Sequence, residues 1–155
     1  MNKQEFLKTY GSIYEHSPWV AAAAFDVGAD TPEKIHAAMK TEVKAASHEK
    51  KLALIRAHPD LACAQGLTAA STSEQAGAGL NQCTPEELAE FQKLNAEYKN
   101  KFGFPFIVAV RGLHRTDILN QFRQRINNDA DVEFETALEQ IHKIAGFRLA
   151  ALELK

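Results

Sequence analysis

Apolar residues recur along this chain at three- and four-residue intervals, the spacing that places side chains on one side of an α-helix. The spacing predicts short helices over residues 18–25 and around residues 73–80, and further helices over residues 2–10, 32–46, 48–58, 85–101, 116–127 and 131–154. That makes about eight helices and no pair of strands. We therefore expect an all-α, bundle-like fold.

Several of these helices carry recognisable start and stop signals. Thr31 stands before a proline, as an N-cap before the first helical position does, and Ser47 has the form of another N-cap. Thr84 and Glu87 have the spacing of a capping box. Because proline cannot continue the backbone hydrogen bonds of a helix, Pro59 marks the end of the helix before it.

One apolar stretch, residues 102–110, does not fit the helical pattern. Gly103 and Pro105 disfavour a regular helix in its first half, and its second half is rich in β-branched residues. The chain offers no second strand to pair with this stretch. We expect a buried extended segment whose free backbone groups could face a ligand.

Length and composition fit one compact globular domain. A chain of 155 residues buries roughly 68–70% of its unfolded surface, enough for a continuous core, so we expect a single domain over residues 1–155. Hydrophobic residues make up 45% of the chain and charged residues 25%, as in ordinary soluble proteins. The formal net charge is -2 and the two signs are interspersed. We therefore expect neither nucleic acid nor a membrane as a partner.

The spacing of the cysteines and the sequences at the two ends of the chain indicate the expected cell compartment. Cys63 and Cys83 form no CxxC pair and have no histidine at metal-ligand spacing, so neither a disulfide framework nor a structural zinc site is expected. The first residues lack the apolar core of a signal peptide, and the last three are not a peroxisomal signal. We expect a cytoplasmic protein with two buried, reduced thiols.

Six histidines are scattered through the chain, and one of them stands apart. His58 is followed by a proline, which places it at an exposed junction between a helix and a loop. The polar or amphipathic surroundings of four others predict solvated imidazoles; these are His16, His36, His48 and His142. His114 lies in a sequence typical of a turn.

The tripeptide His58-Pro59-Asp60 allows two interpretations. It can be a helix-ending turn, since an imidazole is favoured at the negative end of the helix dipole. The same tripeptide marks J-domain cochaperones, which use it to contact an Hsp70 partner, and Lys50, Lys51 and Arg56 give the preceding helix a similar basic character. The Gly- and Ser-rich sequence that follows differs from a J-domain, where another amphipathic helix would soon begin.

Glu74 stands in a polar cluster with two interpretations. Ser71 and Glu74 have the spacing of a capping box. Alternatively, Ser71, Glu74 and Gln75 could bind the polar groups of a ring, because the small residues 76–79 allow a close approach. Together with an imidazole, a carboxylate can carry out acid–base chemistry without a metal.

Arg148 lies in the last predicted helix, among mostly apolar residues and two positions after Gly146. It can be an exposed arginine whose stem covers apolar surface. A glycine inside a helix costs about 1 kcal/mol relative to alanine, which indicates that something packs closely there. A guanidinium in such surroundings suits an anionic substrate.

Taken together, these residues resemble the 2-oxo-4-hydroxy-4-carboxy-5-ureidoimidazoline (OHCU) decarboxylase family. The resemblance covers most of the chain and is most specific in Ala-His-Pro-Asp-Leu-Ala at residues 57–62, Ser-Thr-Ser-Glu-Gln at 71–75, Ala-Gly-Leu at 78–80, Leu-Asn before Tyr98, and Lys-Phe-Gly-Phe-Pro-Phe at 101–106. It implies decarboxylation of OHCU to (S)-allantoin in urate breakdown, no cofactor, a small ureidoimidazoline substrate and a homodimer.

The resemblance also implies a role for each candidate residue. His58 would be the acid–base residue, with Glu74 as its partner at the substrate. Arg148 would anchor the substrate. The remaining pocket residues would be Pro59, Ser71 and Gln75, together with the backbone of Phe106, Ile107, Val108, Ala109 and Val110. A J-domain-like interaction module and a metal-dependent hydrolase remain as alternatives.

Overall fold

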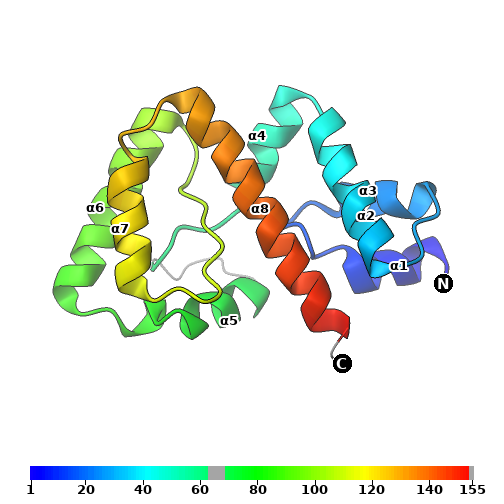
Figure 1. The fold of residues 1–155 in the computed structure, drawn as a ribbon, viewed down its shortest axis with the longest axis horizontal. Coiled ribbons are helices and arrows are strands. Elements are labelled where there is room, and N and C mark those ends of the chain that lie inside the picture. The colour runs from blue at the N-terminus through cyan, green and yellow to red at the C-terminus, as the bar shows by residue number, and fades with distance from the viewer. Residues whose placement is uncertain (63–68, 154–155) are drawn as a thin grey trace. The chain divides into compact units, whose positions relative to one another are not determined.

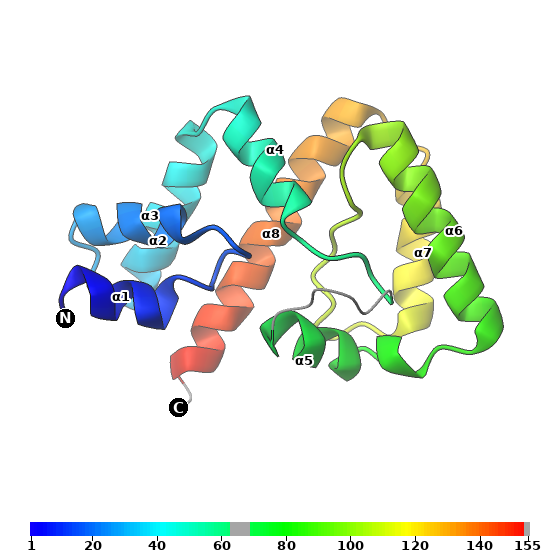
Figure 2. The same cartoon turned by 180° about the vertical axis from the view of Figure 1, so that it is seen from behind.

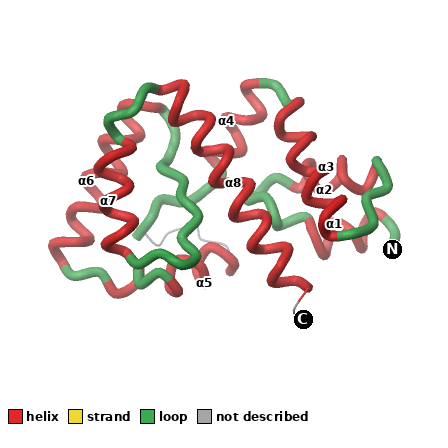
Figure 3. The backbone as a smooth tube through the Cα atoms, in the orientation of Figure 1, coloured by secondary structure: helices red, strands yellow, loops and turns green. Residues whose placement is uncertain are grey.

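The computed structural model describes residues 1–62 and 69–153. Within these ranges the chain forms eight α-helices, one short 3-10 helix and no β-strand (Figure 1 and Figure 3). The all-α fold of about eight helices is therefore confirmed. The helices are α1 (Lys3–Tyr10), α2 (Pro18–Asp26), α3 (Pro32–Ala45), α4 (His48–Arg56), α5 (Ala69–Gly77), η1 (Leu80–Gln82), α6 (Pro85–Phe102), α7 (Arg115–Arg125) and α8 (Ala130–Glu153).

The chain divides into two compact units. The first unit consists of Met1–His58 and Ile141–Lys155, and the second of Pro59–Gln140. Helix α8 therefore contributes its beginning to the second unit and its end to the first. The expectation of a single domain over residues 1–155 stays a prediction.

The first unit is built around α2, which packs against both α1 and α3 (Figure 2). Helix α2 is apolar nearly all round, as a buried helix must be. Methionine and aliphatic side chains from α3 and α4 complete the core. The fully or nearly fully buried residues include Val20, Ala24, Ile35, Met39, Val43, Leu54 and Ile55.

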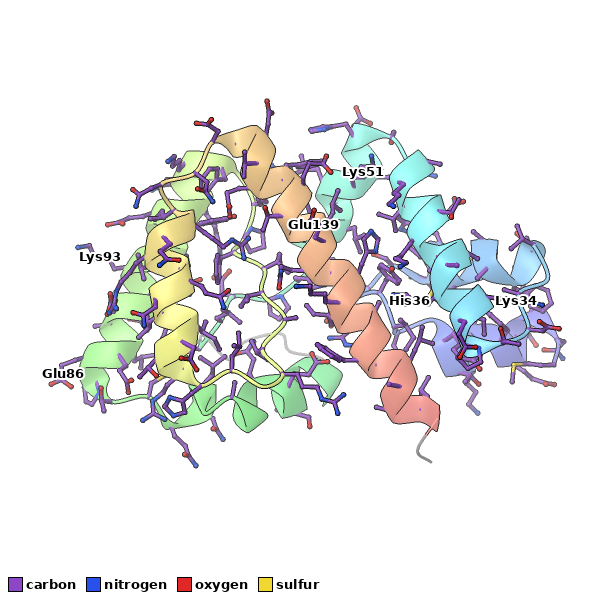
Figure 4. The ribbon with its side chains drawn as sticks, in the orientation of Figure 1. Lys34, His36, Lys51, Glu86, Lys93 and Glu139 are labelled. Atoms are coloured by element: carbon purple, nitrogen blue, oxygen red, sulfur yellow. The ribbon has the colours of Figure 1, made fainter. Side chains whose placement is uncertain are left out.

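The second unit pairs α6 with α7, which lie side by side in Figure 1 and Figure 2. Its core is aromatic: Phe106 stacks on Phe122 with ring centroids 4.0 Å apart, and Tyr98 meets both rings edge-on. On the opposite side of α6, the exposed Glu86 and Lys93 point outward (Figure 4). This amphipathic division agrees with the helical spacing of the sequence.

The helix boundaries follow the capping residues. The side chains of Thr31, Ser47 and Thr84 each accept a hydrogen bond from the backbone N–H three residues later, and Thr84 with Glu87 completes the expected capping box. Gly103 ends α6 with a φ of 80°, in the left-handed region where glycine carries no steric penalty. The sequence predicts these boundaries because each N-cap contact joins residues only three positions apart.

The region before α6 differs from the prediction. Helix α5 already begins at Ala69 rather than near residue 73, and Leu80 belongs to the separate helix η1. Ser71 therefore lies within α5 and not at its N-cap, so the interpretation of Ser71 and Glu74 as a capping box is wrong. The reason is that alanine at the start of α5 favours helix without producing the apolar stripe on which the prediction relied.

The two cysteines have different outcomes. Cys83 is a free thiol that is only partly buried, so the expectation of full burial is wrong for it. Cys63 lies outside the described residues. In the described part of the chain, no helix is both long enough and apolar enough to cross a membrane.

The capping box of α6 gives a test of the local signals. We expect Thr84→Ala to lower the free energy of unfolding by about 1 kcal/mol, because the N–H of Glu87 loses its acceptor. For a chain of this size that is a fall of about 2–4 °C in the melting temperature. Thr84→Ser is the matched control, since it keeps the hydroxyl and should melt like the wild type. Equal melting temperatures for the alanine variant and the wild type would contradict the prediction.

Candidate active site

His58 follows the last turn of α4, and its side chain folds back onto that turn. Its Nδ1 lies 2.9 Å from the carbonyl oxygen of Leu54. Because a carbonyl oxygen only accepts, Nδ1 carries the proton and Nε2 is left with a lone pair. The imidazole thus gives the carbonyl of Leu54 a second hydrogen bond, since this carbonyl also accepts from the N–H of Ala57 at 3.3 Å, and it presents a base on its other nitrogen.

The imidazole of His58 is buried, with a relative exposure of 8%. The expectation of an exposed junction is therefore wrong, although the position at the helix end is correct. The sequence locates the end of α4 through Pro59 but does not show that the side chain turns back onto the helix.

Burial also sets the protonation state of His58. Desolvation lowers its pKa to about 4, and the hydrogen bond to Leu54 and the charge of Glu15 only partly oppose that shift. The charges of Arg148 and His16 lower the pKa further. His58 is consequently neutral near pH 7 and can take up a proton before it gives one away.

Arg148 lies in the same unit as His58 and is held by a buried ion pair. Its Nη2 donates to Oε2 of Glu15 at 2.8 Å, and its Nη1 donates to the carbonyls of Ser12 and Ile13 at 3.3 Å each. Glu15 is 1% exposed and Arg148 is 8% exposed. The interpretation of Arg148 as an exposed arginine is therefore wrong.

Glu15 was not anticipated from the sequence. The available signal is a single acidic residue directly after the apolar Ile13 and Tyr14 and shortly before the start of α2. An acid in such surroundings needs a cation if it is buried, but the sequence does not say which one. The partner, Arg148, lies 133 positions further along the chain.

Two histidines expected to be solvated are instead half-buried in the first unit. His36, labelled on α3 in Figure 4, donates from Nε2 to the carbonyl of His142 at 3.1 Å, and the hydroxyl of Tyr14 lies 2.7 Å from Nδ1 of His142. A Cβ at Gly146 would stand 3.1 Å from the ring of His36. This contact is the close packing that a glycine inside α8 indicated. His16 and His48 are exposed as expected.

In the second unit, Gln75 holds the chain that follows His58. Its Oε1 accepts from the N–H of Ala62 at 3.0 Å, and its Nε2 donates to the carbonyl of Asp60 at 3.3 Å. Asn95 donates to the carbonyl of Leu61 at 3.0 Å. Both ends of the Gln75 amide are thus used to fix residues 60–62, where Ala62 adopts a left-handed φ of 61°.

Asp60 itself forms an ion pair with Lys99 at 2.6 Å. A J-domain-like interaction would need the tripeptide available to a partner protein, and this contact gives it an internal role instead. Among the described residues, no group of three histidines, cysteines or acids is placed to hold a metal ion. The contacts described for the second unit therefore add no support for a J-domain-like interaction module or for a metal-dependent hydrolase.

The remaining predicted site residues also lie in the second unit. Glu74 is half-buried on α5, and Ser71 belongs to the same helix, although its side chain is outside the described set. Pro59 is half-buried at the start of the unit. The structure therefore places His58 and Arg148 in the first unit and the other candidates in the second. The pairing of Glu74 with His58 stays a prediction.

Residues 106–110 are buried and non-helical, as expected. Three of their backbone groups are bonded within the second unit: Arg125 donates to the carbonyl of Ile107, Gln140 accepts from the N–H of Ala109, and Leu113 donates to the carbonyl of Val110. Because these three backbone groups already have partners within the protein, a ligand would have to bind other backbone groups of residues 106–110.

A buried imidazole whose pKa lies well below its ordinary value is typical of sites at which an enzyme transfers protons. A family model described as OHCU decarboxylase matches residues 1–150. The chain belongs to the OHCU decarboxylase family.

Individual relatives agree with this assignment. A 2-oxo-4-hydroxy-4-carboxy-5-ureidoimidazoline decarboxylase of Haloferax volcanii is 40% identical over 151 residues, which is 97% of this chain and 90% of the relative. The uric acid degradation bifunctional protein PucL of Bacillus subtilis is 40% identical over 152 residues, 97% of this chain and 31% of that longer protein.

Two solved structures are similar over the full fold. A crystal structure of (S)-allantoin synthase has a TM-score of 0.78 at 36% identity and covers 98% of this chain and 51% of its own. A crystal structure of OHCU decarboxylase in the presence of (S)-allantoin has a TM-score of 0.78 at 25% identity and covers 100% of both chains.

The low pKa of His58 predicts a dependence of stability on pH. The folded-state pKa of about 4 lies below the ordinary value of 6.5, so the unfolded chain binds the proton more readily and stability is lost as the pH falls below 6.5. Between pH 7 and pH 5 we expect His58 to account for a loss of about 2 kcal/mol. Urea unfolding at the two pH values measures the loss.

His58→Asn should lose correspondingly less stability than the wild type between pH 7 and pH 5. His48→Gln, at an exposed position, should keep the wild-type dependence. If His58→Asn and the wild type lose the same free energy of unfolding, the imidazole of His58 is not held neutral by the fold.

Proposed function

We propose that this chain decarboxylates OHCU to (S)-allantoin without a cofactor, with His58 as the acid–base residue and Glu74 as its partner at the substrate. Membership of the OHCU decarboxylase family supports the reaction. The observation that carries the role of His58 is its buried, neutral imidazole, fixed by Leu54 so that Nε2 keeps its lone pair.

The substrate itself supplies the electron sink. Its carboxylate sits on a carbon that also bears a hydroxyl and that adjoins a ring C=N bond. When the C–C bond breaks and CO2 leaves, its electron pair forms a C=C bond to the neighbouring ring carbon. The electron pair of the former C=N double bond passes to the ring nitrogen, which takes up a proton, and the result is an enol. The enol becomes a carbonyl when its oxygen loses a proton and the neighbouring carbon gains one. The protein therefore needs only to transfer protons, and imidazole is suited to this because it can both accept and donate a proton near neutral pH.

His58 and Glu74 have different roles in these proton transfers. The neutral His58 takes up a proton, and the resulting imidazolium is a strong acid because burial disfavours its charge. Glu74 accepts the hydrogen bond of the substrate hydroxyl as this oxygen becomes a carbonyl. Protonation of the carbon from one face then gives the (S) product.

The other predicted site residues complete the pocket in this proposal. Arg148 anchors the anionic substrate, and Glu15 fixes the direction of its guanidinium. Pro59, Ser71 and Gln75 line the pocket, with Gln75 acting through the backbone of residues 60–62. Residues 106–110 contribute backbone groups.

The family resemblance also supports a cytoplasmic homodimer that takes a small molecule as its substrate. Light scattering on the purified protein at micromolar concentration measures the oligomeric state. A mass of twice 17.2 kDa is the expected result, and a monomer at all concentrations would contradict it.

The first functional prediction concerns His58. We expect His58→Asn to reduce the rate of OHCU decarboxylation by roughly 100 to 10,000-fold, the usual contribution of general acid–base catalysis. The measurement is CO2 release from freshly generated OHCU, followed together with the optical activity of the allantoin formed. His48→Gln is the control and should turn over like the wild type. Wild-type turnover of folded His58→Asn would remove His58 from the mechanism.

The second functional prediction concerns Glu74. Because α5 begins at Ala69, Glu74 does not complete a cap with Ser71. We expect Glu74→Gln to keep its melting temperature within a few degrees and to lose turnover severely, since a neutral amide accepts the hydroxyl hydrogen bond more weakly than a carboxylate. Glu86→Gln, at an exposed position on α6, is the matched control. Normal turnover of Glu74→Gln would show that the carboxylate has no catalytic role.

A further inference from the structure

Two side chains of the second unit hold the backbone on either side of Val108. Arg125 donates from Nη1 to the carbonyl of Ile107 at 2.6 Å. Gln140, near the middle of α8, accepts with Oε1 from the N–H of Ala109 at 2.9 Å. The first bond fixes the peptide group before Val108 and the second fixes the one after it.

The geometry of a trans peptide then determines where Val108 points its own polar groups. In each planar peptide group the carbonyl and the N–H point in opposite directions, and no peptide bond in the described residues is cis. The N–H of Val108 therefore points away from Arg125, and its carbonyl points away from Gln140. Neither group has a hydrogen-bond partner among the described residues.

Arg125 is itself held rigidly. Its Nε donates to Oε1 of Glu133 at 3.0 Å, and Glu133 is completely buried. Tyr98 donates to the same oxygen at 2.5 Å, and Asn128 donates to the other at 2.9 Å. The guanidinium also lies 4.4 Å from the ring centroid of Phe106. A planar cation held at so many points gives the Ile107 carbonyl a fixed donor.

We propose that Arg125 and Gln140 are positioning residues, which hold these two peptide groups so that the N–H and the carbonyl of Val108 are directed at the substrate. This inference rests on the proposed function, in which residues 106–110 face the ligand. A cyclic or open ureide carries neighbouring N–H and C=O groups. The carbonyl and the N–H of Val108 can therefore accept from and donate to one ureide group. Arg125 and Gln140 act on substrate binding through the backbone and do not touch the reacting atoms.

Gln140 offers the sharper test because it is only half-buried, so its replacement should leave the fold intact. Gln140→Met fills a similar space but removes the acceptor for the N–H of Ala109. We expect it to raise KM for OHCU about tenfold, which corresponds to about 1.4 kcal/mol, with kcat reduced less than threefold. Its inhibition constant for (S)-allantoin, a neutral ureide, should rise by a similar factor.

Two further variants separate positioning from a purely structural role. Gln140→Glu keeps an oxygen acceptor, so its inhibition constant for (S)-allantoin should stay within threefold of the wild type. Glu139→Gln, on the exposed neighbouring position labelled in Figure 4, should behave as the wild type throughout. If Gln140→Met lowers the melting temperature but leaves KM and the allantoin inhibition constant unchanged, Gln140 is only structural and the inference is wrong.

Arg125 is tested by Arg125→Lys, which keeps a positive charge beside the buried Glu133 but lacks the planar fork that serves Glu133 and Ile107 together. We expect a rise in KM of about tenfold, equivalent to about 1.4 kcal/mol, and a wild-type helical spectrum. An unchanged KM would remove Arg125 from the inference. Failure of the wild type to release CO2 from OHCU would instead overturn the proposed function.

Discussion

The hydrogen bond from Nδ1 of His58 to the carbonyl of Leu54 fixes the chemistry that the first unit can offer. It determines which imidazole nitrogen carries the proton, and the burial that accompanies it keeps the ring neutral near pH 7. It also depends on the end of α4, because in an uninterrupted helix the Leu54 carbonyl would accept from the backbone N–H of His58, which here donates to the carbonyl of Ile55 instead. The proline that ends the helix thereby leaves an acceptor for the side chain that precedes it.

Each unit also buries a glutamate against an arginine. Glu15 holds Arg148 in the first unit, and Glu133 holds Arg125 in the second. Such pairs add little net stability, since the cost of removing two charges from water offsets most of their attraction, yet losing one partner costs about 3–5 kcal/mol. Their main effect is geometric: each glutamate fixes the direction of a guanidinium that the proposed function uses, directly at Arg148 and through the backbone at Arg125.

The helices were predictable because their signals are local. Thr31, Ser47 and Thr84 cap helices through residues three positions away, and the non-helical nature of residues 106–110 follows from the glycine and proline before them. Burial of polar side chains was not predictable in the same way. Glu133 and His142 lie in a helix whose sequence pattern is amphipathic. Whether such a polar side chain is solvated or buried depends on a partner that is distant in the sequence, here Tyr98 for Glu133 and Tyr14 for His142.

In the proposed reaction, the low pKa of His58 favours the transfer of its proton to the substrate. While the substrate carries its carboxylate, a nearby negative charge favours the protonated imidazole and opposes the effect of burial. CO2 leaves as a neutral molecule, so the negative charge stays on the ring together with the electron pair of the broken bond. Transfer of the proton from the imidazolium neutralises that charge, and burial favours the transfer because it disfavours the charged form of His58. A solvated histidine would gain less from giving up its proton, because water stabilises its charged form.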